Sequence, residues 1–517
     1  MGTQNNRHRA IGDLTPNERL RQSIQEFIDK EKNIDERRKY GQFSTPFDLA
    51  KEIVSYGITL LPGRNISFLE PCIGSGSFYS ALLSATKANK YNVQVATGIE
   101  MDRVYFEASK RIWQDESINL INSDFARVEP MRKHNLIITN PPYVRHHYLT
   151  QEEKVYLADA GKNETGITLS GLAGLYCYFI LLAHKWLAPD AICGWLVPSE
   201  FMDVNYGSAI KKYLLHNVHL LRIHRYDPQN SIFSDALVSS CVVWFKNETI
   251  SHDYNVEFSF GGTHDKPLQS KKIKKSDLIR ERKWTRFPKQ EIRTNKNAEI
   301  TLGNFFEIKR GLATGDNNFF IMSRDKINAL GMDVSFFKPI LPSPRYLKTN
   351  LVDSDSEGIP KLKPQYFLLD CQLTEQEIEE KHPAVWNYLQ SGIERTSKKY
   401  LCKSRKRWYW QEQRDSTYFL CSYMGRGKDD GMPIRFILNL SEAIVTNSYL
   451  MLYPKDYLRR VIAENPNVVY RIWETLKNIN KKELEAEGRV YGGGLKKIEP
   501  RELAKVPCED LICFCEV

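Results

Sequence analysis

Apolar and polar residues in the first half of the chain form a pattern that predicts short strands separated by helices. Several runs rich in β-branched and aromatic residues have the length of strands, and helix-like segments lie between most of them. These runs are at 66–71, 93–100, 118–124, 135–139, 191–198, 219–226 and 239–247. Strands that alternate with helices are typical of βαβ units. We therefore predict one doubly wound α/β domain with a seven-stranded sheet.

The composition and the pattern of apolar residues change at three places along the chain, and these changes predict the domain boundaries. Residues 1–36 are polar with a helical pattern, which indicates a loosely attached N-terminal helical extension. Residues 37–250 hold the alternating pattern, and residues 251–300 are polar and basic, as expected of a linker. Residues 301–517 are irregular and rich in Arg, Lys, Tyr and Trp, which indicates a second domain.

Composition narrows the class of protein. With 42% hydrophobic and 26% charged residues the chain matches soluble globular proteins, which argues against the disordered and fibrous classes. The net charge of +10 and the pI near 8.9 favour a polyanionic partner. The ten cysteines form no CxxC pair and have no histidine at metal-ligand spacing, so we expect reduced thiols and no metal site.

The apolar segments of the chain are too short for a membrane protein. The most apolar one, GLAGLYCYFILLA from Gly171, reaches His184 and Lys185 before it attains spanning length, so it predicts a buried helix. The N-terminal residues show no apolar stretch that suggests secretion. We therefore expect a cytoplasmic protein without a membrane partner.

A glycine-rich turn and two acidic strand ends converge on one predicted crevice. Gly74 and Gly76 in EPCIGSGSF follow the first strand and open a helix, where a backbone must approach a ligand closely. Glu100 ends the second strand, where such folds hold a ribose diol. Asp124 and Phe125 end the third strand and offer a polar group and a ring to an adenine. A glycine-rich turn alone serves several cofactors, but three successive strand ends together predict a nucleotide cofactor.

The stretch LIITNPPYVRHHY from Leu136 predicts a strand that ends in a rigid turn. Two prolines cannot continue a ladder, so the strand must stop at Asn140. The turn therefore presents an amide, a carbonyl group and an aromatic ring at the carboxyl edge of the sheet, where open α/β folds bind ligands.

The motifs GQFSTP, FLEPCIGSGSF, GIEMD, NSDF and NPPY occur in this order. They resemble the motif series of the gamma-class adenine-N6 DNA methyltransferases of type II restriction-modification systems, over residues 40–247. GNFFEIKRGLATGDNNFFI and RVYGGGLKKIEP resemble, more weakly, the target-recognition region of that family. The resemblance implies a Rossmann-like S-adenosylmethionine-dependent methyltransferase domain with a seven-stranded mixed sheet, followed by a C-terminal α+β DNA target-recognition domain.

The resemblance also implies where S-adenosylmethionine binds. Thr45 and Pro46 would cap the methionine end of this cofactor. The other residues of its pocket would be Glu70, Cys72, Gly74, Gly76, Glu100, Met101, Asp124, Phe125 and Asn140. Ser44 and Cys72 occupy positions at which the family varies.

Catalysis would centre on NPPY. An adenine N6 amino group is a poor nucleophile because its lone pair is delocalised into the ring. If the side-chain oxygen of Asn140 and the carbonyl oxygen of Pro141 each accept one N–H, the nitrogen approaches tetrahedral geometry and can attack a sulfonium methyl group. Pro141 and Pro142 would supply rigidity. The base must be flipped out of the duplex, to stack on Tyr143 and, by the resemblance, on Phe233, for which a core position before a buried strand is the alternative.

Basic segments with interleaved aromatic residues are the candidate DNA contacts. Arg145 follows NPPY, and for its neighbours His146 and His147 we favour loop contacts with phosphate or substrate over a general-base role. KSRKRWYWQEQR and YGGGLKK suit phosphate contacts, although a solvated basic face is the alternative for any single lysine. The candidates in these two stretches are Lys403, Arg405, Lys406, Arg407, Lys496 and Lys497. Binding dominated by phosphate predicts a steep loss of affinity with salt.

The expected partner is double-stranded DNA with a specific recognition sequence, which would associate the protein with a prokaryotic nucleoid. The resemblance implies a separately encoded restriction endonuclease without direct contact, and we expect a monomer because one base is modified per event. Three alternatives stay open. They are a methyltransferase for RNA or a protein glutamine, a DNA-binding protein with a degenerate methyltransferase domain, and a fused endonuclease. The large basic C-terminal half disfavours the first, the intact motifs disfavour the second, and no convincing nuclease motif supports the third.

Overall fold

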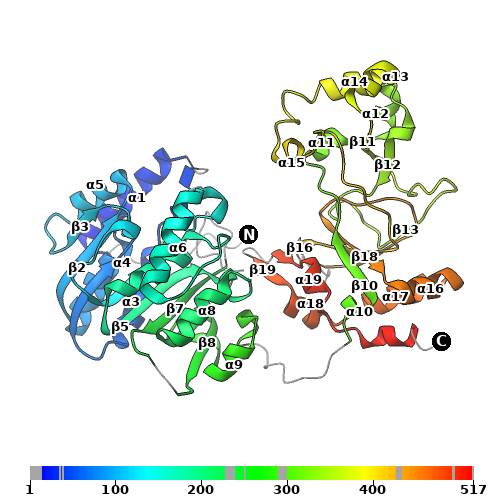
Figure 1. Ribbon diagram of the computed structural model, residues 1–517. Coiled ribbons are helices and arrows are strands. Elements are labelled where there is room, and N and C mark those ends of the chain that lie inside the picture. Colours follow the sequence, from blue (N-terminus) through cyan, green and yellow to red (C-terminus); the bar gives the residue numbers. More distant parts are fainter. Residues whose placement is uncertain are drawn as a thin grey trace, which may run out of the picture. The chain divides into compact units, whose positions relative to one another are not determined.

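The computed structural model describes residues 14–33, 36–37, 40–227, 239–249, 252–288, 300–426, 434–491 and 495–514 (Figure 1). The chain divides into two compact units, unit 1 (residues 1–293) and unit 2 (residues 294–517). Each unit has its own hydrophobic core.

One large mixed sheet forms the centre of unit 1. Among the described residues it has nine strands, in the order β3-β2-β1-β4-β5-β7-β6-β8-β9. The strands from β3 to β5 run parallel, whereas β7 is antiparallel to both of its neighbours. The bounds are β1 (Asn65–Glu70), β2 (Asn92–Glu100), β3 (Asn119–Asn122), β4 (His134–Thr139), β5 (Leu187–Pro198), β6 (His219–Arg225), β7 (Ser240–Lys246), β8 (Asn255–Gly262) and β9 (Pro267–Lys274). The carboxyl ends of the parallel strands therefore meet at one edge.

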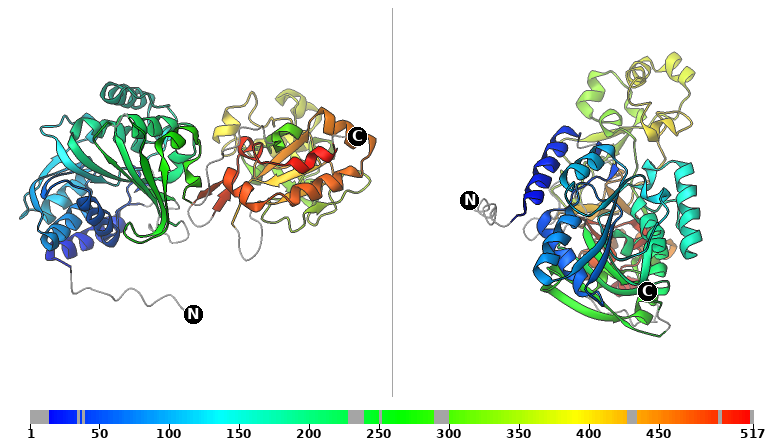
Figure 2. Two further views of the ribbon diagram at one scale, coloured as in Figure 1. Left: turned by 90° about the horizontal axis from the view of Figure 1, so that it is seen from below. Right: turned by 90° about the vertical axis from the view of Figure 1, so that its left-hand side faces the viewer.

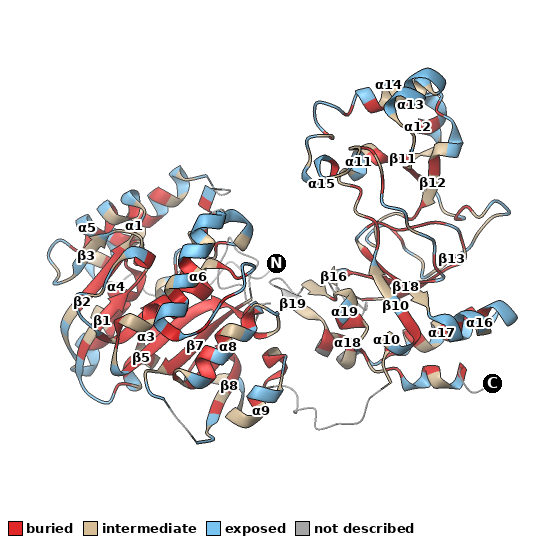
Figure 3. Cartoon of the chain, viewed as in Figure 1, coloured by how far each residue is buried: buried red, intermediate tan, exposed pale blue. Residues whose placement is uncertain are grey.

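Helices cover both faces of this sheet (Figures 1 and 2). In β4, Leu136 and Ile138 join a core with α3, α4 and α5, while Ile137 joins a core with α6, α7 and α8, as the two-residue period of a strand requires. The strands are largely buried and the outer faces of the helices are exposed (Figure 3). The helices are α1 (Pro16–Glu31), α3 (Phe47–Thr59), α4 (Ser77–Asn89), α5 (Arg103–Ile112), α6 (Gln151–Thr165), α7 (Leu175–Leu182), α8 (Gly207–His216) and α9 (Lys275–Arg280), and the 3-10 helices are η2 (Phe125–Arg127), η3 (His146–Tyr148), η4 (Ala183–Trp186), η5 (Ser199–Met202) and η6 (Trp284–Arg286).

The predicted α/β fold with a mixed sheet is confirmed, and the sheet is larger than the seven strands expected. The seven predicted runs are β1 to β7. Strands β8 and β9 come from residues 255–274, inside the segment that we expected to be a linker. In the edge strand β9 most side chains are exposed and Ile273 is buried, so PLQSKKIK lacks an apolar alternation. Charged side chains on an edge strand prevent it from pairing with another strand. The same side chains replace the apolar alternation by which a strand is recognised in a sequence.

Helix α1 packs on unit 1, contrary to the expected loose attachment. The Thr15 hydroxyl oxygen accepts the Glu18 N–H at 3.2 Å, and Pro16 occupies the first turn, so both residues begin the helix favourably. Ile28 packs against Tyr105 of α5. The buried face of α1 consists of Glu18, Arg21, Gln25 and Ile28.

Unit 2 is a mixture of helices and mostly antiparallel strands, as the predicted α+β class requires. Its described residues form a five-stranded sheet, β10-β18-β15-β17-β13, and two three-stranded sheets, β11-β14-β12 and β16-β20-β19. The strands are β10 (Phe306–Arg310), β11 (Ile321–Ser323), β12 (Phe337–Ile340), β13 (Leu351–Val352), β14 (Tyr366–Leu369), β15 (Phe419–Ser422), β16 (Met424–Arg426), β17 (Phe436–Asn439), β18 (Tyr449–Pro454), β19 (Arg489–Tyr491) and β20 (Leu495–Lys497). The helices are α10 (Leu302–Phe305), α11 (Asn317–Phe320), α12 (Arg324–Ala329), α13 (Glu375–Lys381), α14 (Pro383–Gln390), α15 (Tyr400–Lys403), α16 (Asp456–Glu464), α17 (Val468–Lys477), α18 (Lys481–Glu487) and α19 (Pro500–Leu503), with 3-10 helices η7 (Val334–Phe336) and η9 (Glu509–Phe514).

The most apolar segment of the sequence forms α7, whose residues are mostly buried beneath the sheet. In the described parts of the chain, none of the helices combines the length and apolarity that a membrane crossing needs.

Candidate active site

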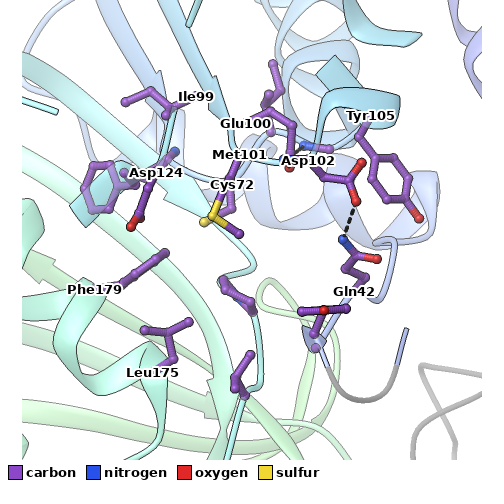
Figure 4. A pocket seen from close by; sticks show the side chains of 18 of the residues that line it. Gln42, Cys72, Ile99, Glu100, Met101, Asp102, Tyr105, Asp124, Leu175 and Phe179 are labelled. Carbon is purple, nitrogen blue, oxygen red and sulfur yellow. Dashed lines mark hydrogen bonds between the residues drawn. The ribbon is translucent and has the colours of Figure 1, made fainter. Parts of the chain in front are cut away.

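A cavity of about 560 Å³ lies at the edge of the sheet where β1, β2 and β4 end (Figure 4). Its volume is typical of ligand pockets, and its position is the one at which parallel sheets bind ligands. Pro46 and Gly76 are not in its lining. The predicted cofactor residues that line it are Thr45, Glu70, Cys72, Gly74, Glu100, Met101, Asp124, Phe125 and Asn140.

The glycine-rich loop between β1 and α4 forms one wall of the cavity. Gly76 has φ 88°, and a Cβ atom on it would lie 2.4 Å from the indole nitrogen of Trp113. That nitrogen donates to the Ser75 carbonyl oxygen at 3.1 Å. Only glycine fits at position 76, because both the backbone angle and the close approach of Trp113 exclude a side chain.

Glu70 holds the start of α4. Its carboxylate accepts the Tyr79 N–H at 3.1 Å, and the side chain is 2% exposed. Burial raises the pKa of Glu70 well above the usual value, while backbone N–H groups of Tyr79 and Phe78 act in the opposite direction. The contact assigns Glu70 to support of the loop, at the helix end where a carboxylate is favourable.

Glu100 joins the end of β2 to the glycine-rich loop. Its Oε2 accepts the Gly74 N–H at 2.8 Å, and its Oε1 accepts the Asp102 N–H at 2.8 Å. A carboxylate has about four lone-pair sites, so acceptor capacity is left for two hydroxyl groups of a ligand. Burial raises the pKa of Glu100, although the two N–H groups lower it.

Asp102 lies beside this carboxylate and is held by residues from the N-terminal segment. Gln42 donates to Asp102 at 2.9 Å (Figure 4). Lys32 also donates to this carboxylate. Although burial raises its pKa, the hydrogen bonds from Lys32 and Gln42 lower the pKa of Asp102 on balance. Gln42 belongs to the GQFSTP motif, but the sequence did not indicate that Gln42 or Lys32 contacts Asp102, because both are distant in the chain from that strand end.

The third strand end places its two predicted residues differently. Asp124 is partly exposed, and its carboxylate accepts the Ala126 N–H at 3.0 Å. Phe125 is 2% exposed, and its ring centroid lies 5.3 Å from that of Phe179 and 5.8 Å from that of Trp186. Phe125 therefore anchors the core below the cavity, and Phe179, which sequence reasoning missed, is a second ring in the lining.

Two further predicted residues differ in exposure. Met101 is 65% exposed at the cavity. Cys72 is partly buried, and burial together with the carboxylates of Glu100 and Glu70 raises the pKa of its thiol well above the usual range. The Cys72 sulfur is therefore a neutral contact surface for a ligand, and a nucleophilic role does not suit it.

Asn140 has one end of its amide group held and the other free. Its Nδ2 donates to the Phe43 carbonyl oxygen at 3.1 Å and to the Thr45 hydroxyl oxygen at 3.2 Å. A carbonyl oxygen can only accept, so the amide NH₂ must face Phe43, and Oδ1 must face the other way. The Oδ1 atom is buried and has no hydrogen-bond partner among the described residues.

The segment before α3 lies directly against the NPPY turn. Gly41 has φ +64°, and a Cβ atom on it would lie 2.3 Å from the Tyr143 nitrogen. The ring of Phe43 lies 6.4 Å from that of Tyr143. Gly41 and Phe43 belong to the GQFSTP motif, but the sequence did not reveal that they support the turn.

The remaining NPPY residues have distinct surroundings. Pro141 is buried and Pro142 lines the cavity. Tyr143 is half-buried, and its hydroxyl donates to the Leu196 carbonyl oxygen at 3.0 Å, which fixes the ring. Phe233, the predicted stacking partner, lies outside the described residues.

The predicted DNA contacts outside β20 differ in exposure and in the contacts that their side chains make. Arg145 in unit 1 and Lys403 and Lys406 in unit 2 are exposed. The Arg407 guanidinium lies 4.9 Å from the centre of the Trp410 ring, and the Lys406 Nζ lies 5.6 Å from it. Arg405 donates to the Ala313 carbonyl oxygen at 2.8 Å, so it stabilises its own loop.

The two basic residues of β20 are paired with carboxylates. Lys496 forms an ion pair with Glu485. Lys497 lies 2.9 Å from a Glu499 oxygen and 4.9 Å from the centre of the Tyr423 ring. Both lysines are half-buried, which distinguishes them from Lys403.

Two buried histidines and a partly buried glutamate form a group with metal-ligand types, although no metal was expected from the sequence. Glu52, His224 and His264 offer ligand atoms within 4.8 Å of one another, at a place outside the cavity lining. Glu52 accepts from His264 Nδ1 at 2.8 Å, which ties up one candidate ligand pair. Burial and the positive charge of nearby Arg222 lower the pKa of His264 to about 3, and the same charge opposes a divalent cation. We therefore assign no metal to this group.

Two family models that match this chain describe restriction-modification methyltransferases. Residues 77–233 match the model of the Eco57I restriction-modification methylase, and residues 282–513 match that of the type II methyltransferase M.Eco57I, C-terminal domain. The chain belongs to this Eco57I family of type II restriction-modification methyltransferases.

Relatives of similar length agree with this family. The chain is 27% identical to the type II methyltransferase M.AccI of Acinetobacter calcoaceticus over 508 residues, which cover 95% of this chain and 89% of that protein. It is 26% identical to the type II methyltransferase M.XamI of Xanthomonas campestris pv. amaranthicola over 480 residues, which cover 90% and 84%.

Solved structures share the fold at low sequence identity. The cryoEM structure of a DrdV–DNA complex matches 90% of this chain and 55% of that chain, with a TM-score of 0.53 and 12% identity. The type IIL restriction-modification enzyme MmeI in complex with DNA matches 85% of this chain and 63% of that chain, with a TM-score of 0.50 and 13% identity.

Proposed function

We propose that the protein transfers a methyl group from S-adenosylmethionine to N6 of an adenine that has been flipped out of double-stranded DNA. The observation that carries this proposal is the buried, unpartnered Oδ1 of Asn140. An acceptor left without a partner in a buried site costs free energy, so its retention points to a substrate donor. An exocyclic amino group supplies such a donor.

The residues around the cavity suit S-adenosylmethionine. The Glu100 carboxylate has acceptor capacity for a ribose diol, and Asp124 can accept from an amino group. Cys72, Phe179 and Met101 supply soft or apolar surface. The cofactor, when bound, supplies an electrophilic methyl group on a positively charged sulfur.

The residues of the turn then act by position. Asn140 Oδ1 and the Pro141 carbonyl oxygen would each accept one N–H of the amino group, which draws its lone pair out of conjugation. Because the nitrogen becomes acidic only after the methyl transfer, no strong base is needed, and His146 and His147 are not required. Oriented acceptors in a site that excludes water supply most of the rate enhancement.

The target base would stack on the Tyr143 ring, whose hydroxyl bond to Leu196 holds it in place. We propose Phe233 as the second stacking ring, and Thr45 and Pro46 as the cap over the methionine end of the cofactor. Flipping costs a few kcal/mol, which the stacking contacts offset. Arg145, Lys403, Lys406 and Arg407 would contact phosphate.

We also propose a biological role, which the family supports. Methylation would protect host DNA from a separately encoded restriction endonuclease of the same sequence specificity, and the protein would work as a cytoplasmic monomer on the bacterial chromosome. The DrdV and MmeI structures are complexes with DNA, which supports DNA as the substrate.

Single-molecule sequencing of DNA from a methylation-deficient host tests the proposal. The full-length protein is expressed beside Asn140→Ala and beside Asn163→Ala, an exposed asparagine of α6 that serves as a matched control. We expect N6-methyladenine in one recurrent sequence for the unaltered protein and for Asn163→Ala, and none for Asn140→Ala.

Other outcomes replace parts of the proposal. Modified cytosine in a recurrent sequence would show that the amino group is that of cytosine. A protein that binds S-adenosylmethionine but leaves the DNA unmodified would direct the search to RNA or a protein glutamine. DNA binding without cofactor binding would identify a degenerate methyltransferase domain.

A further inference from the structure

Helix α1 places a buried arginine on the glycine-rich loop. Arg21 Nη1 donates to the Ser75 hydroxyl oxygen at 3.0 Å and to the Ser77 hydroxyl oxygen at 2.9 Å. The Arg21 side chain is 3% exposed. Ser75 and Ser77 both line the cavity. Arg21, which belongs to none of the sequence motifs, therefore contacts two residues of the candidate ligand site.

Glu18 completes this contact. Its two carboxylate oxygens accept from Nη2 and Nε of Arg21, each at 2.7 Å, which is the two-bond geometry that fixes a guanidinium. Glu18 Oε2 also accepts from the Ser80 hydroxyl at 2.5 Å. The Glu18–Arg21 pair therefore bonds the loop and the first turn of α4 at once.

The other end of α1 contacts the part of the cavity wall that follows β2. Lys32, the residue that caps α1, pairs with Asp102, next to Glu100, and its Nζ lies 4.6 Å from the Tyr105 ring centre. Gln25, from the middle of the helix, lines the cavity itself. Helix α1 thus connects the two strand ends that bound the site, and α1 lies against both α4 and α5 (Figure 1).

Stability alone does not account for a charged pair at this place. Replacing a buried ion pair by apolar residues of similar size is often neutral or stabilising, because the desolvation of both charges is avoided. Apolar residues, however, cannot donate hydrogen bonds to the hydroxyl oxygens of Ser75 and Ser77. The charged pair is suited to fix the loop in one conformation.

We propose that the Glu18–Arg21 pair positions the glycine-rich loop for cofactor binding, so that helix α1 is part of the cofactor site. The inference rests on the proposed use of S-adenosylmethionine. Glu18 and Arg21 are positioning residues, since their side chains act through the loop. A loop held before binding loses less conformational freedom on binding, so the pair should contribute to affinity.

The test compares cofactor affinity in full-length variants of equal stability. Glu18→Leu/Arg21→Met replaces the pair by apolar residues, and Arg19→Gln alters an exposed arginine of the same helix as a control. Calorimetric titration gives the Kd for S-adenosylmethionine, steady-state assays give KM and kcat, and thermal unfolding checks the fold. We expect the double variant to raise Kd and KM about tenfold, with kcat at saturating cofactor and DNA affinity unchanged.

The outcomes separate this inference from the proposed function. If the unaltered protein does not bind S-adenosylmethionine, the proposed function fails. If it binds and the folded double variant binds equally well, the positioning role is overturned while the function stands. If the double variant does not fold, Arg21→Lys replaces it in the test. The lysine keeps the positive charge opposite Glu18 but has a single nitrogen to donate to Ser75 and Ser77. An unchanged Kd for S-adenosylmethionine in this variant would also overturn the inference.

Discussion

The glycine-rich loop of unit 1 and the basic segment at residues 403–407 of unit 2 are both candidate ligand contacts, yet the structure holds them in opposite ways. In the loop, the Gly74 N–H, the Ser75 carbonyl group and both serine hydroxyls are bonded to Glu100, Trp113 and Arg21. In the basic segment, Lys403 and Lys406 are exposed, and the Lys406 Nζ lies 5.6 Å from the centre of the Trp410 ring. A preorganised site binds a small ligand precisely, whereas exposed cations suit a long polyanion.

The same contrast divides the basic residues themselves. Arg405, Lys496 and Lys497 form hydrogen bonds or ion pairs within unit 2, whereas Lys403 and Lys406 are exposed. A string of positive charges in a sequence therefore does not distinguish a DNA contact from a local ion pair. Four changes test the comparison.

Gly41→Ala should give the largest effect. The added Cβ would lie 2.3 Å from the Tyr143 nitrogen, so the NPPY turn must move. A displacement of about 1 Å in a catalytic group can cost about 100-fold in rate, and we expect such a fall in the single-turnover methylation rate. Gly63→Ala is the control, because a Cβ there meets no atom within 4 Å. A rate near that of the unaltered protein would show that the turn is not tightly held.

Glu100→Gln should weaken cofactor binding about tenfold at neutral pH, because the charged acceptor is lost. Burial raises the pKa of Glu100, so in the unaltered protein this group takes up its proton at a higher pH than an exposed glutamate. Binding should therefore weaken as the pH falls through that raised value, and titration calorimetry of Glu100→Gln should show no such dependence. Glu107→Gln, on the exposed face of α5, is the control. The same pH profile in both variants would exclude Glu100 as its source.

Thr45→Val should lower kcat about fivefold to tenfold, because Asn140 loses one of the two acceptors that orient its amide. Thr45→Ser retains the hydroxyl and should restore the rate. The division between kcat and cofactor KM decides the role of the residue. A raised KM with an unchanged kcat would assign Thr45 to the cofactor cap alone and would overturn its role in orienting Asn140.

Lys403→Ala/Lys406→Ala should have the smallest effect per residue and should act on the salt dependence. Log affinity falls as log salt rises, and each lost phosphate contact makes this negative slope shallower by about 0.9. Lys496→Ala/Lys497→Ala should leave the slope unchanged, because Glu485 and Glu499 already pair these lysines. Fluorescence anisotropy on a duplex at several salt concentrations measures both slopes. Equal slopes in the two double variants would show that exposed lysines and lysines paired with carboxylates do not differ in their contact with DNA.

Much of the fold was predictable, because the hydrophobic periods of strands and of helices can both be recognised in the sequence. The cavity lining was predictable where the backbone dictates the residue, as at Gly74, Glu100 and Asn140. Strand β9 was not, because an edge strand need not be apolar. The role of Phe125 was not, because a ring beside a strand end can turn toward the ligand or toward the core, and packing against Phe179 and Trp186 decides it.

The sequence by itself determined the order of the strands along the chain, the place of the rigid turn at Asn140 and the family, because these depend on local geometry and on motifs read in order. Only the tertiary structure decided which atoms are left free. It turns Asn140 Oδ1 away from Phe43 and Thr45, and it brings Arg21 onto Ser75 from a distance of 54 residues. Such contacts join segments that are remote in the chain, and their partners are selected by the packing of helices on the sheet.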